Sequence, residues 1–422
     1  MSSNSTSSLE SSGTSESTST LKLLDEETNT TQESIKRAWS VPESQPRIQS
    51  RAEEVLTHTT RLPFTHSEWK GMMDLRQEWQ KEGLESEVRR VETRHWPVLT
   101  SRWYVGLMFL ALSISQLTRW GGLLFAAFVM ILAVLDVLGH PLKALKQRFV
   151  MKATQVTWGW KDSERKQAPV LVVSASYNTP AGDGFERRHD RLSRWPLGFF
   201  LNPTRLWLLW LLVGALVLCW SVLQPSTASF WSLLGINLLF GLSFWKWGGA
   251  SAHKDDGGEH AAAVVALREV ATRSLERKWP FHLHFVAMGA SDSPEGVELS
   301  LKEWNNKGRI LGWVHLDELY AGQPLQTVTK EGCLLLQPHA SELVEQAQWT
   351  ANHLEGIRST SRYGRSPSAW AAILGQPALM LTSVPPHSSS DSPPSVSFEQ
   401  VDRAAGFVTT LLHRLAREEE SL

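Results

Sequence analysis

Hydrophobic positions follow two different patterns along this chain, and one of them is a set of long apolar segments. These segments cover residues 103–118, 121–139, 205–223 and 229–248. Each of the last three has about 19 or 20 residues, enough at about 1.5 Å per residue to cross the apolar core of a bilayer. The pattern therefore predicts about four transmembrane helices in two hairpins. Because the first segment is shorter, a re-entrant first hairpin is the alternative.

The residues that flank these segments predict how the segments would lie in a membrane. Tryptophans stand near the segment ends, as they do in the aromatic belts of membrane proteins. Lys and Arg cluster outside both hairpins, whereas the short connections inside them carry only Arg119. Positive charge marks the cytoplasmic side. We therefore predict an integral, multipass membrane protein with the lipid bilayer as a partner and its soluble domain on the cytoplasmic side.

The rest of the chain has the shorter helical and strand-like hydrophobic patterns of a globular α/β domain. Helical periodicity covers the region from residue 48 to residue 92. Further along, apolar runs typical of buried strands alternate with helical patterns, and this predicts a mixed sheet with helices on both faces. The strand-like runs are 170–174, 284–288, 310–316 and 378–382, and the helical patterns are 259–277, 338–353 and 398–417.

The order of these patterns divides the chain into six predicted parts. The first is rich in Ser, Thr and Glu with few large apolar residues, so it cannot bury enough surface to fold and is predicted to be disordered. The parts are a tail (1–45), a helical lead-in of the α/β domain (46–100), a first hairpin (101–140), a first domain segment (141–204), a second hairpin (205–248) and a second domain segment (249–422).

Charge and cysteine content exclude some classes of function. The chain has 42 Lys and Arg against 43 Asp and Glu, a formal net charge of -1. That balance argues against a general polyanion binder, so we expect no nucleic-acid partner. Two cysteines, Cys219 and Cys333, cannot form a disulfide framework.

Five short motifs carry the candidate chemistry, and each lies beside a predicted strand or at the start of a predicted helix. They are, in chain order, Ala175-Ser176-Tyr177-Asn178, Glu259-His260-Ala261-Ala262-Ala263, Gly289-Ala290-Ser291-Asp292, His315-Leu316-Asp317-Glu318, and Gly375-Gln376-Pro377-Ala378-Leu379 with His387 downstream. In this order the motifs resemble those of the di-zinc exopeptidases of metallopeptidase family 28. At the corresponding places that family has His-Tyr-Asp, Asp-Asn-Ala-Ser-Gly, Gly-Ala-Glu-Glu, Leu-Asp-Met and His-Thr.

The resemblance implies a zinc-exopeptidase-like fold with a site whose ligands are partly replaced. In such a site two zinc ions share a bridging carboxylate, and a separate Glu activates the attacking water. By this correspondence the first metal-binding His becomes Ser176, whose hydroxyl is a poor zinc ligand. The Asp that orients that His becomes Asn178, so the support of the ligand is weakened as well.

The remaining positions of the site follow from the same resemblance. The bridging Asp corresponds to Glu259, which is one methylene longer, and the second Glu corresponds to Asp292. The general-base Glu corresponds to Ser291, which cannot accept a proton near neutral pH. Only Asp317 and His387 match the family by residue type.

These replacements predict an inactive exopeptidase-like domain that acts in binding, scaffolding or regulation, without a resident cofactor. Its former active-site cleft would receive a protein or peptide partner. A single residual zinc ion held among Glu259, Asp292, Asp317 and His387 is one alternative. Another is an active zinc-dependent aminopeptidase with a rearranged metal site, in which Glu295 or Asp255 supplies the lost general base. In a third, the function resides in the apolar segments and the domain serves as an anchor.

Overall fold

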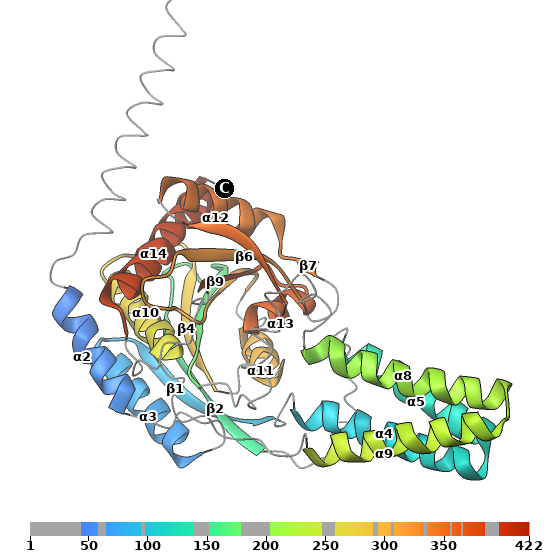
Figure 1. Cartoon of the computed structure of the whole chain (residues 1–422). Coiled ribbons are helices and arrows are strands. Elements are labelled where there is room, and N and C mark those ends of the chain that lie inside the picture. Colours follow the sequence, from blue (N-terminus) through green and yellow to red (C-terminus); the bar gives the residue numbers. More distant parts are fainter. Residues whose placement is uncertain are drawn as a thin grey trace, which may run out of the picture.

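The computed structural model places one large sheet beside a helical bundle (Figure 1). The structure describes residues 44–57, 65–93, 98–137, 152–178, 203–246, 258–289, 294–304, 308–332, 336–354, 357–363, 366–384 and 396–421. Residues 1–43 of the predicted tail lie outside the described residues.

Nine strands make up the sheet in the described part of the chain. They are β1 (Glu85–Thr93), β2 (Lys152–Lys161), β3 (Val170–Ser176), β4 (His282–Met288), β5 (Ile310–Leu316), β6 (Leu325–Gly332), β7 (Gln337–Pro338), β8 (Arg358–Tyr363) and β9 (Ala378–Ser383). The strand order is β1-β2-β4-β3-β5-β9-β6-β7, and β8 pairs with β6. Strands β4, β3, β5 and β9 run parallel, whereas β1, β2 and β6 add antiparallel pairs. The sheet is mixed, as predicted.

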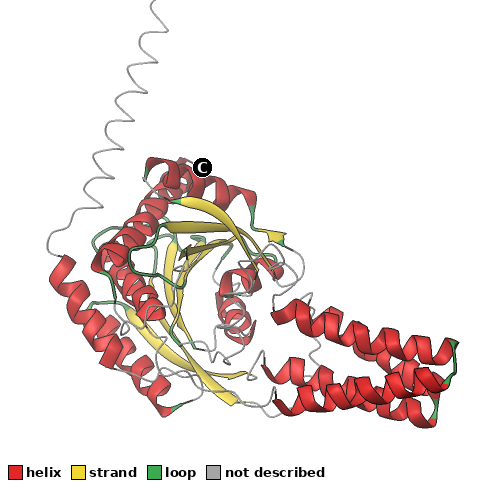
Figure 2. Cartoon of the chain, in the orientation of Figure 1, coloured by secondary structure: helices red, strands yellow, loops and turns green. Residues whose placement is uncertain are grey.

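Helices cover both faces of this sheet (Figure 2). One side carries α2 (Ser44–Thr57), α3 (His66–Lys81), α10 (Gly258–Leu275), α12 (Ser341–His353) and α14 (Phe398–Ser421). The other side carries α11 (Pro294–Trp304) and α13 (Pro367–Ile373). The predicted α/β architecture, with helices on both faces of a mixed sheet, is therefore confirmed.

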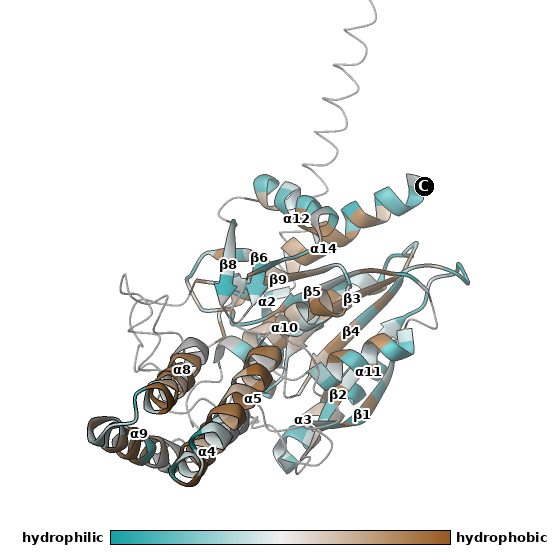
Figure 3. Ribbon diagram, turned by 90° about the vertical axis from the view of Figure 1, so that its right-hand side faces the viewer, coloured by the Kyte–Doolittle hydropathy of each residue, from teal (hydrophilic) through white to brown (hydrophobic). Residues whose placement is uncertain are grey.

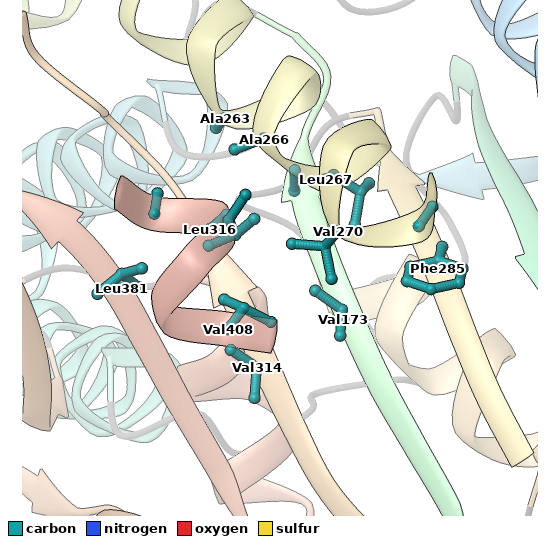
Figure 4. Close-up of a cluster of buried hydrophobic side chains, with 14 of the residues drawn as sticks. Val173, Ala263, Ala266, Leu267, Val270, Phe285, Val314, Leu316, Leu381 and Val408 are labelled. Carbon is teal, nitrogen blue, oxygen red and sulfur yellow. The ribbon is translucent and has the colours of Figure 1, made fainter. Parts of the chain in front are cut away.

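The central strands are buried on both faces, and this explains their sequence. Every residue of β3 is buried. Val173, Val314 and Leu381 pack beneath α10 and α14 in one cluster (Figure 4). Val172 and Trp313 point to the opposite face and belong to the cluster of α11 and α13. A strand covered on both sides is a continuous apolar run rather than an alternating one, so the apolar pattern locates these strands.

The parallel strands end at one edge of the sheet, and this carboxyl edge positions the candidate site. Strand β3 ends at Ser176 and β5 ends at Leu316. Helix α10 leads into β4, which is parallel to β3, so it begins at the same edge and crosses back over the sheet. In open α/β sheets, ligands bind outside the carboxyl ends of the strands.

The four apolar segments form two helical hairpins, α4 (Val98–Leu117) with α5 (Arg119–Val137), and α8 (Pro203–Leu223) with α9 (Thr227–Lys246). One face of each helix packs in a shared core, in which Met108, Val129, Leu211 and Phe240 are completely buried. Among the described residues, no helix combines the length and the apolar character needed to cross a membrane.

The predicted transmembrane helices are therefore wrong, and the integral, multipass, cytoplasmic-side placement that depended on them is contradicted as well. The prediction of membrane-spanning helices used the apolar length of the segments, with flanking tryptophans and basic residues as support. Length does not distinguish a helix surrounded by lipid from a helix that packs against other helices. In the structure the four helices pack against one another around a shared buried core.

The outer sides of the bundle are also rich in apolar residues (Figure 3). Most of the large apolar side chains that the described residues expose lie on these four helices. Leu117, Leu124 and Leu223 are 88%, 70% and 70% exposed. Clustered exposure of this kind is typical of surfaces that contact other molecules.

Candidate functional site

The ends of β3 and β5 bring two of the sequence motifs together. The register pairs Ser174 on β3 with His315 on β5. Two residues further along, Ser176 ends β3 and Asp317 follows the end of β5. Because side chains two residues apart on a strand share a face, Ser174, Ser176 and His315 lie on the side that α11 and α13 cover.

His315 is fully buried between two serines of β3. Its Nδ1 lies 2.9 Å from Ser174 Oγ, and its Nε2 lies 3.2 Å from Ser176 Oγ. Trp313 Nε1 donates a hydrogen bond to Ser174 Oγ at 2.7 Å. Burial lowers the pKa of His315 to about 4, although nearby carboxylates oppose this shift. The imidazole is therefore neutral at neutral pH.

Asp317 joins strand β5 to helix α10 and to strand β8. Its Oδ1 lies 2.9 Å from His260 Nδ1 in the first turn of α10. Its Oδ2 lies 3.6 Å from Arg362 Nη1 on β8. Burial alone would raise the pKa of Asp317, but the neighbouring histidines and the Arg362 guanidinium outweigh burial and hold the pKa well below its ordinary value. Asp317 is therefore ionised, and protein groups already compensate its charge.

The adjacent Glu318 has a backbone φ of 48°, in the left-handed region that residues other than glycine seldom adopt. Its carbonyl oxygen accepts hydrogen bonds from Ser383 Oγ at 2.8 Å and from the Ser383 N–H at 3.2 Å, which hold this turn. Its carboxylate accepts from Arg362 Nη2 at 2.7 Å. Burial and the charge of Asp317 raise the pKa of Glu318, and Arg362 opposes them. One guanidinium therefore contacts two successive carboxylates.

Asn178 connects the end of β3 to helix α3. Its Nδ2 donates to Glu68 Oε1 at 2.9 Å, and the hydroxyl of Thr154 on β2 donates to the same oxygen. Glu68 is 1% exposed and lies in the first turn of α3, where Thr65 caps the helix by accepting from the Glu68 N–H. Asn178 therefore ties a strand to a helix through a buried carboxylate.

The structure describes only part of the predicted site. Ser176, Asn178 and Asp317 are described; Ser176 ends β3, and Asn178 and Asp317 lie just beyond the ends of the adjacent strands β3 and β5. The other predicted positions lie outside the described residues, and they are the side chain of Glu259 together with Ser291, Asp292 and His387.

Three further residues of the site were not predicted from the sequence. His260 and His315 stand inside the sequence motifs, and His315 precedes Asp317 by the two residues that place both on one face of a strand. The two-residue spacing from Asp317 could have identified His315 as a residue of the site. Arg362 has no comparable signal, because it reaches Asp317 only through the pairing of β8 with β6.

The described side chains do not fit a two-zinc centre. Within the ranges that the structure describes, no three His, Cys, Asp or Glu side chains converge as a metal-binding group. Ser176 offers a hydroxyl, a poor zinc ligand, and this hydroxyl is hydrogen-bonded to His315. Asp317 faces the Arg362 guanidinium, whose positive charge would compete with a metal ion for the same carboxylate.

Comparison with known proteins finds similarity at the level of structure only. No family model and no curated protein matches the chain. The LapA aminopeptidase of Legionella pneumophila is 12% identical, with 93% of this chain and 74% of that chain covered and a TM-score of 0.48. A zinc aminopeptidase of Bacillus subtilis is 10% identical, with 87% and 94% covered and a TM-score of 0.48. The glutaminyl cyclase of Fimbriiglobus ruber is 13% identical, with 88% and 96% covered and a TM-score of 0.49.

Proposed function

We propose that the carboxyl edge of the sheet is a binding site for a protein or peptide partner, in an exopeptidase-like domain that does not hydrolyse peptide bonds. The observation that carries the proposal is the pairing of Asp317 with His260 and Arg362. Asp317 matches the exopeptidase motif by residue type, yet its charge is compensated by protein groups rather than left for metal ions. The domain would then act in binding, scaffolding or regulation.

The same edge has groups that suit a peptide. The side chains of Arg362 and Glu318 are 30% and 21% exposed, so both are partly accessible. Their opposite charges can contact the acceptors and donors of a peptide main chain. Recognition of this kind needs no metal ion, and we propose no resident cofactor.

Metal analysis of the purified full-length chain, after zinc loading and mild washing, tests this proposal. We expect no stoichiometric zinc and no release of 4-nitroaniline from leucine 4-nitroanilide. His387→Ala is the matched variant, because it removes the residue that corresponds to the last zinc ligand of the exopeptidases. We expect it to change neither result.

A different outcome would favour one of the alternatives. About two zinc ions per chain, as in a two-metal hydrolase, together with amine release that His387→Ala abolishes, would overturn the proposal and support a zinc aminopeptidase. About one zinc ion per chain without hydrolysis would contradict the absence of a cofactor while leaving the binding role in place.

A further inference from the structure

Four buried side chains of the site form one hydrogen-bonded line. It runs from Trp313 to Ser174, from Ser174 to His315 and from His315 to Ser176. None of the four residues is more than 1% exposed. The last of them, Ser176, stands at the carboxyl edge of the sheet.

The hydrogen bond from Trp313 to Ser174 fixes which groups donate and which accept along the line. An indole N–H can only donate, so Ser174 Oγ is the acceptor of the 2.7 Å hydrogen bond from Trp313 Nε1. Among the described residues, the other hydrogen bond of Ser174 Oγ is the one with His315 Nδ1 at 2.9 Å. A buried hydroxyl hydrogen needs an acceptor. Ser174 therefore donates to Nδ1, and Nδ1 carries no proton.

The protonation of the imidazole then determines that His315 donates to Ser176. His315 is fully buried, and its two ring nitrogens are hydrogen-bonded to serine hydroxyls. A neutral imidazole has one N–H and one acceptor nitrogen. With Nδ1 as the acceptor, the proton is on Nε2, and Nε2 donates to Ser176 Oγ at 3.2 Å. Because its oxygen already accepts this hydrogen bond, Ser176 is left with its own hydrogen to donate.

We infer that this line makes Ser176 a hydrogen-bond donor for a carbonyl oxygen of a bound peptide, at the position where the similar motif of the exopeptidases has a zinc ligand. The inference rests on the proposed binding function, since it assigns a ligand group to the same edge. A carbonyl oxygen only accepts hydrogen bonds, so it suits a hydroxyl that is left with its hydrogen to donate.

The same direction excludes Ser176 as a nucleophile. A nucleophilic serine gives its proton to an unprotonated histidine nitrogen, and a carboxylate usually holds the N–H on the other side of the ring. Here Ser174 makes Nδ1 the acceptor, so Nε2 is protonated and cannot take a proton from Ser176. The serine and the histidine are hydrogen-bonded, but with the polarity opposite to that of a hydrolase.

Nitrogen NMR of the full chain, labelled at histidine and assigned through His315→Gln, tests the direction of the line. We expect the Nε2–H tautomer of His315 in the wild type. Trp313→Phe removes the indole donor, so Ser174 Oγ becomes free to accept from Nδ1–H and both tautomers should appear. An Nδ1–H tautomer in the wild type, or labelling of Ser176 by a fluorophosphonate, would overturn the inference.

A titration with N-acetylglycine N-methylamide, an uncharged compound with peptide carbonyls, tests the ligand group. The His315 Nε2 resonance should respond saturably in the wild type, and the affinity should fall about tenfold in Ser176→Ala, as for the loss of one hydrogen bond. Ser176→Thr keeps the hydroxyl and should restore binding. An unresponsive wild type, or equal affinity in Ser176→Ala, would overturn the assignment. Zinc content and hydrolysis are separate readouts, so a failure of the proposed function would be recognised independently.

Discussion

Asp317 Oδ1 lies 2.9 Å from His260 Nδ1, although 57 residues separate the two along the chain. The contact ties the end of β5 to the first turn of α10. Arg362 approaches the other carboxylate oxygen from β8 at 3.6 Å. Three distant elements therefore meet at one ionised group, and the stability of this edge depends on the protonation of Asp317.

Asp317→Asn should lower the free energy of unfolding by about 2–3 kcal/mol at pH 7. This is less than the cost of breaking a fully buried ion pair, because the Arg362 side chain is partly exposed. The pKa of Asp317 is lower in the folded state than in the unfolded state. Its stabilisation is therefore complete above the unfolded value of about 3.9 and is lost as the pH falls through the folded pKa. Urea unfolding followed by tryptophan fluorescence, from pH 7 down to about pH 2, measures the difference.

Asp162→Asn is the matched control for this prediction. Asp162 also contacts a histidine, His282, at 2.9 Å, but its side chain is 47% exposed. We expect this substitution to change the free energy of unfolding by less than about 1 kcal/mol at pH 7. If the difference between the wild type and Asp317→Asn stayed constant down to the lowest pH, Asp317 would not be the group that couples protonation to stability.

Gly289→Ala should destabilise the fold by about 1–3 kcal/mol through overpacking. Gly289 follows β4, and a Cβ added there would lie 2.8 Å from the backbone oxygen of Gln155 and closer still to Glu68 Oε1 and Thr154 Oγ1. The backbone cannot yield easily, and Glu68 is held by Asn178. Thermal and urea unfolding of the variant would show the loss.

Gly235→Ala provides the opposite control. Gly235 lies in α9, and a Cβ there would have no neighbour within 4 Å. Removing a helical glycine without a clash should stabilise the helix by about 1 kcal/mol. A Gly289→Ala protein as stable as the wild type would mean that the Glu68 contacts rearrange without cost.

Glu269→Gln should lower the free energy of unfolding by about 3–5 kcal/mol, because the side chain of Glu269 is completely buried among three arginines. It accepts hydrogen bonds at 3.0 Å from Arg47 Nε, Arg51 Nη1 and Arg273 Nε. Hydrogen exchange should show faster exchange in α2, which carries two of these arginines. Glu342→Gln, at an exposed position in the first turn of α12, is the control and should leave α2 protected.

The pH dependence of the Glu269 cluster has a definite sign. Burial tends to raise the pKa of Glu269, but the hydrogen bonds and charges of the arginines prevail, and the pKa is lowered. The stabilisation is therefore present above the unfolded pKa of about 4.3 and is lost on acidification. In the wild type, the protection of α2 against hydrogen exchange should fall on acidification. Protection that did not change with pH would argue against the ionised Glu269 as the source of this stabilisation.

Buried parallel strands could be predicted from the sequence, whereas strands with polar faces could not. Strand β5 is a run of apolar residues because helices cover both of its faces. Strand β1 carries charges along its length and forms the edge of the sheet. Arg89 belongs to the basic residues before the first hairpin, but in the structure it pairs with Glu87 and lies 4.6 Å from the ring centroid of Trp158. The positively charged side chain of Arg89 therefore makes contacts that stabilise the edge strand β1.

The sequence by itself determined the helices and buried strands with strong local periods, the two apolar hairpins and the motif positions of Ser176 and Asp317. These features depend on residues a few positions apart, where side-chain spacing reports directly on local structure. The tertiary structure decided that the apolar hairpins pack on one another and that Arg362 reaches Asp317. It also decided the direction of the hydrogen bonds from Trp313 to Ser176. Such relationships depend on strand order and register, which bring distant residues within hydrogen-bonding distance and which no local pattern encodes.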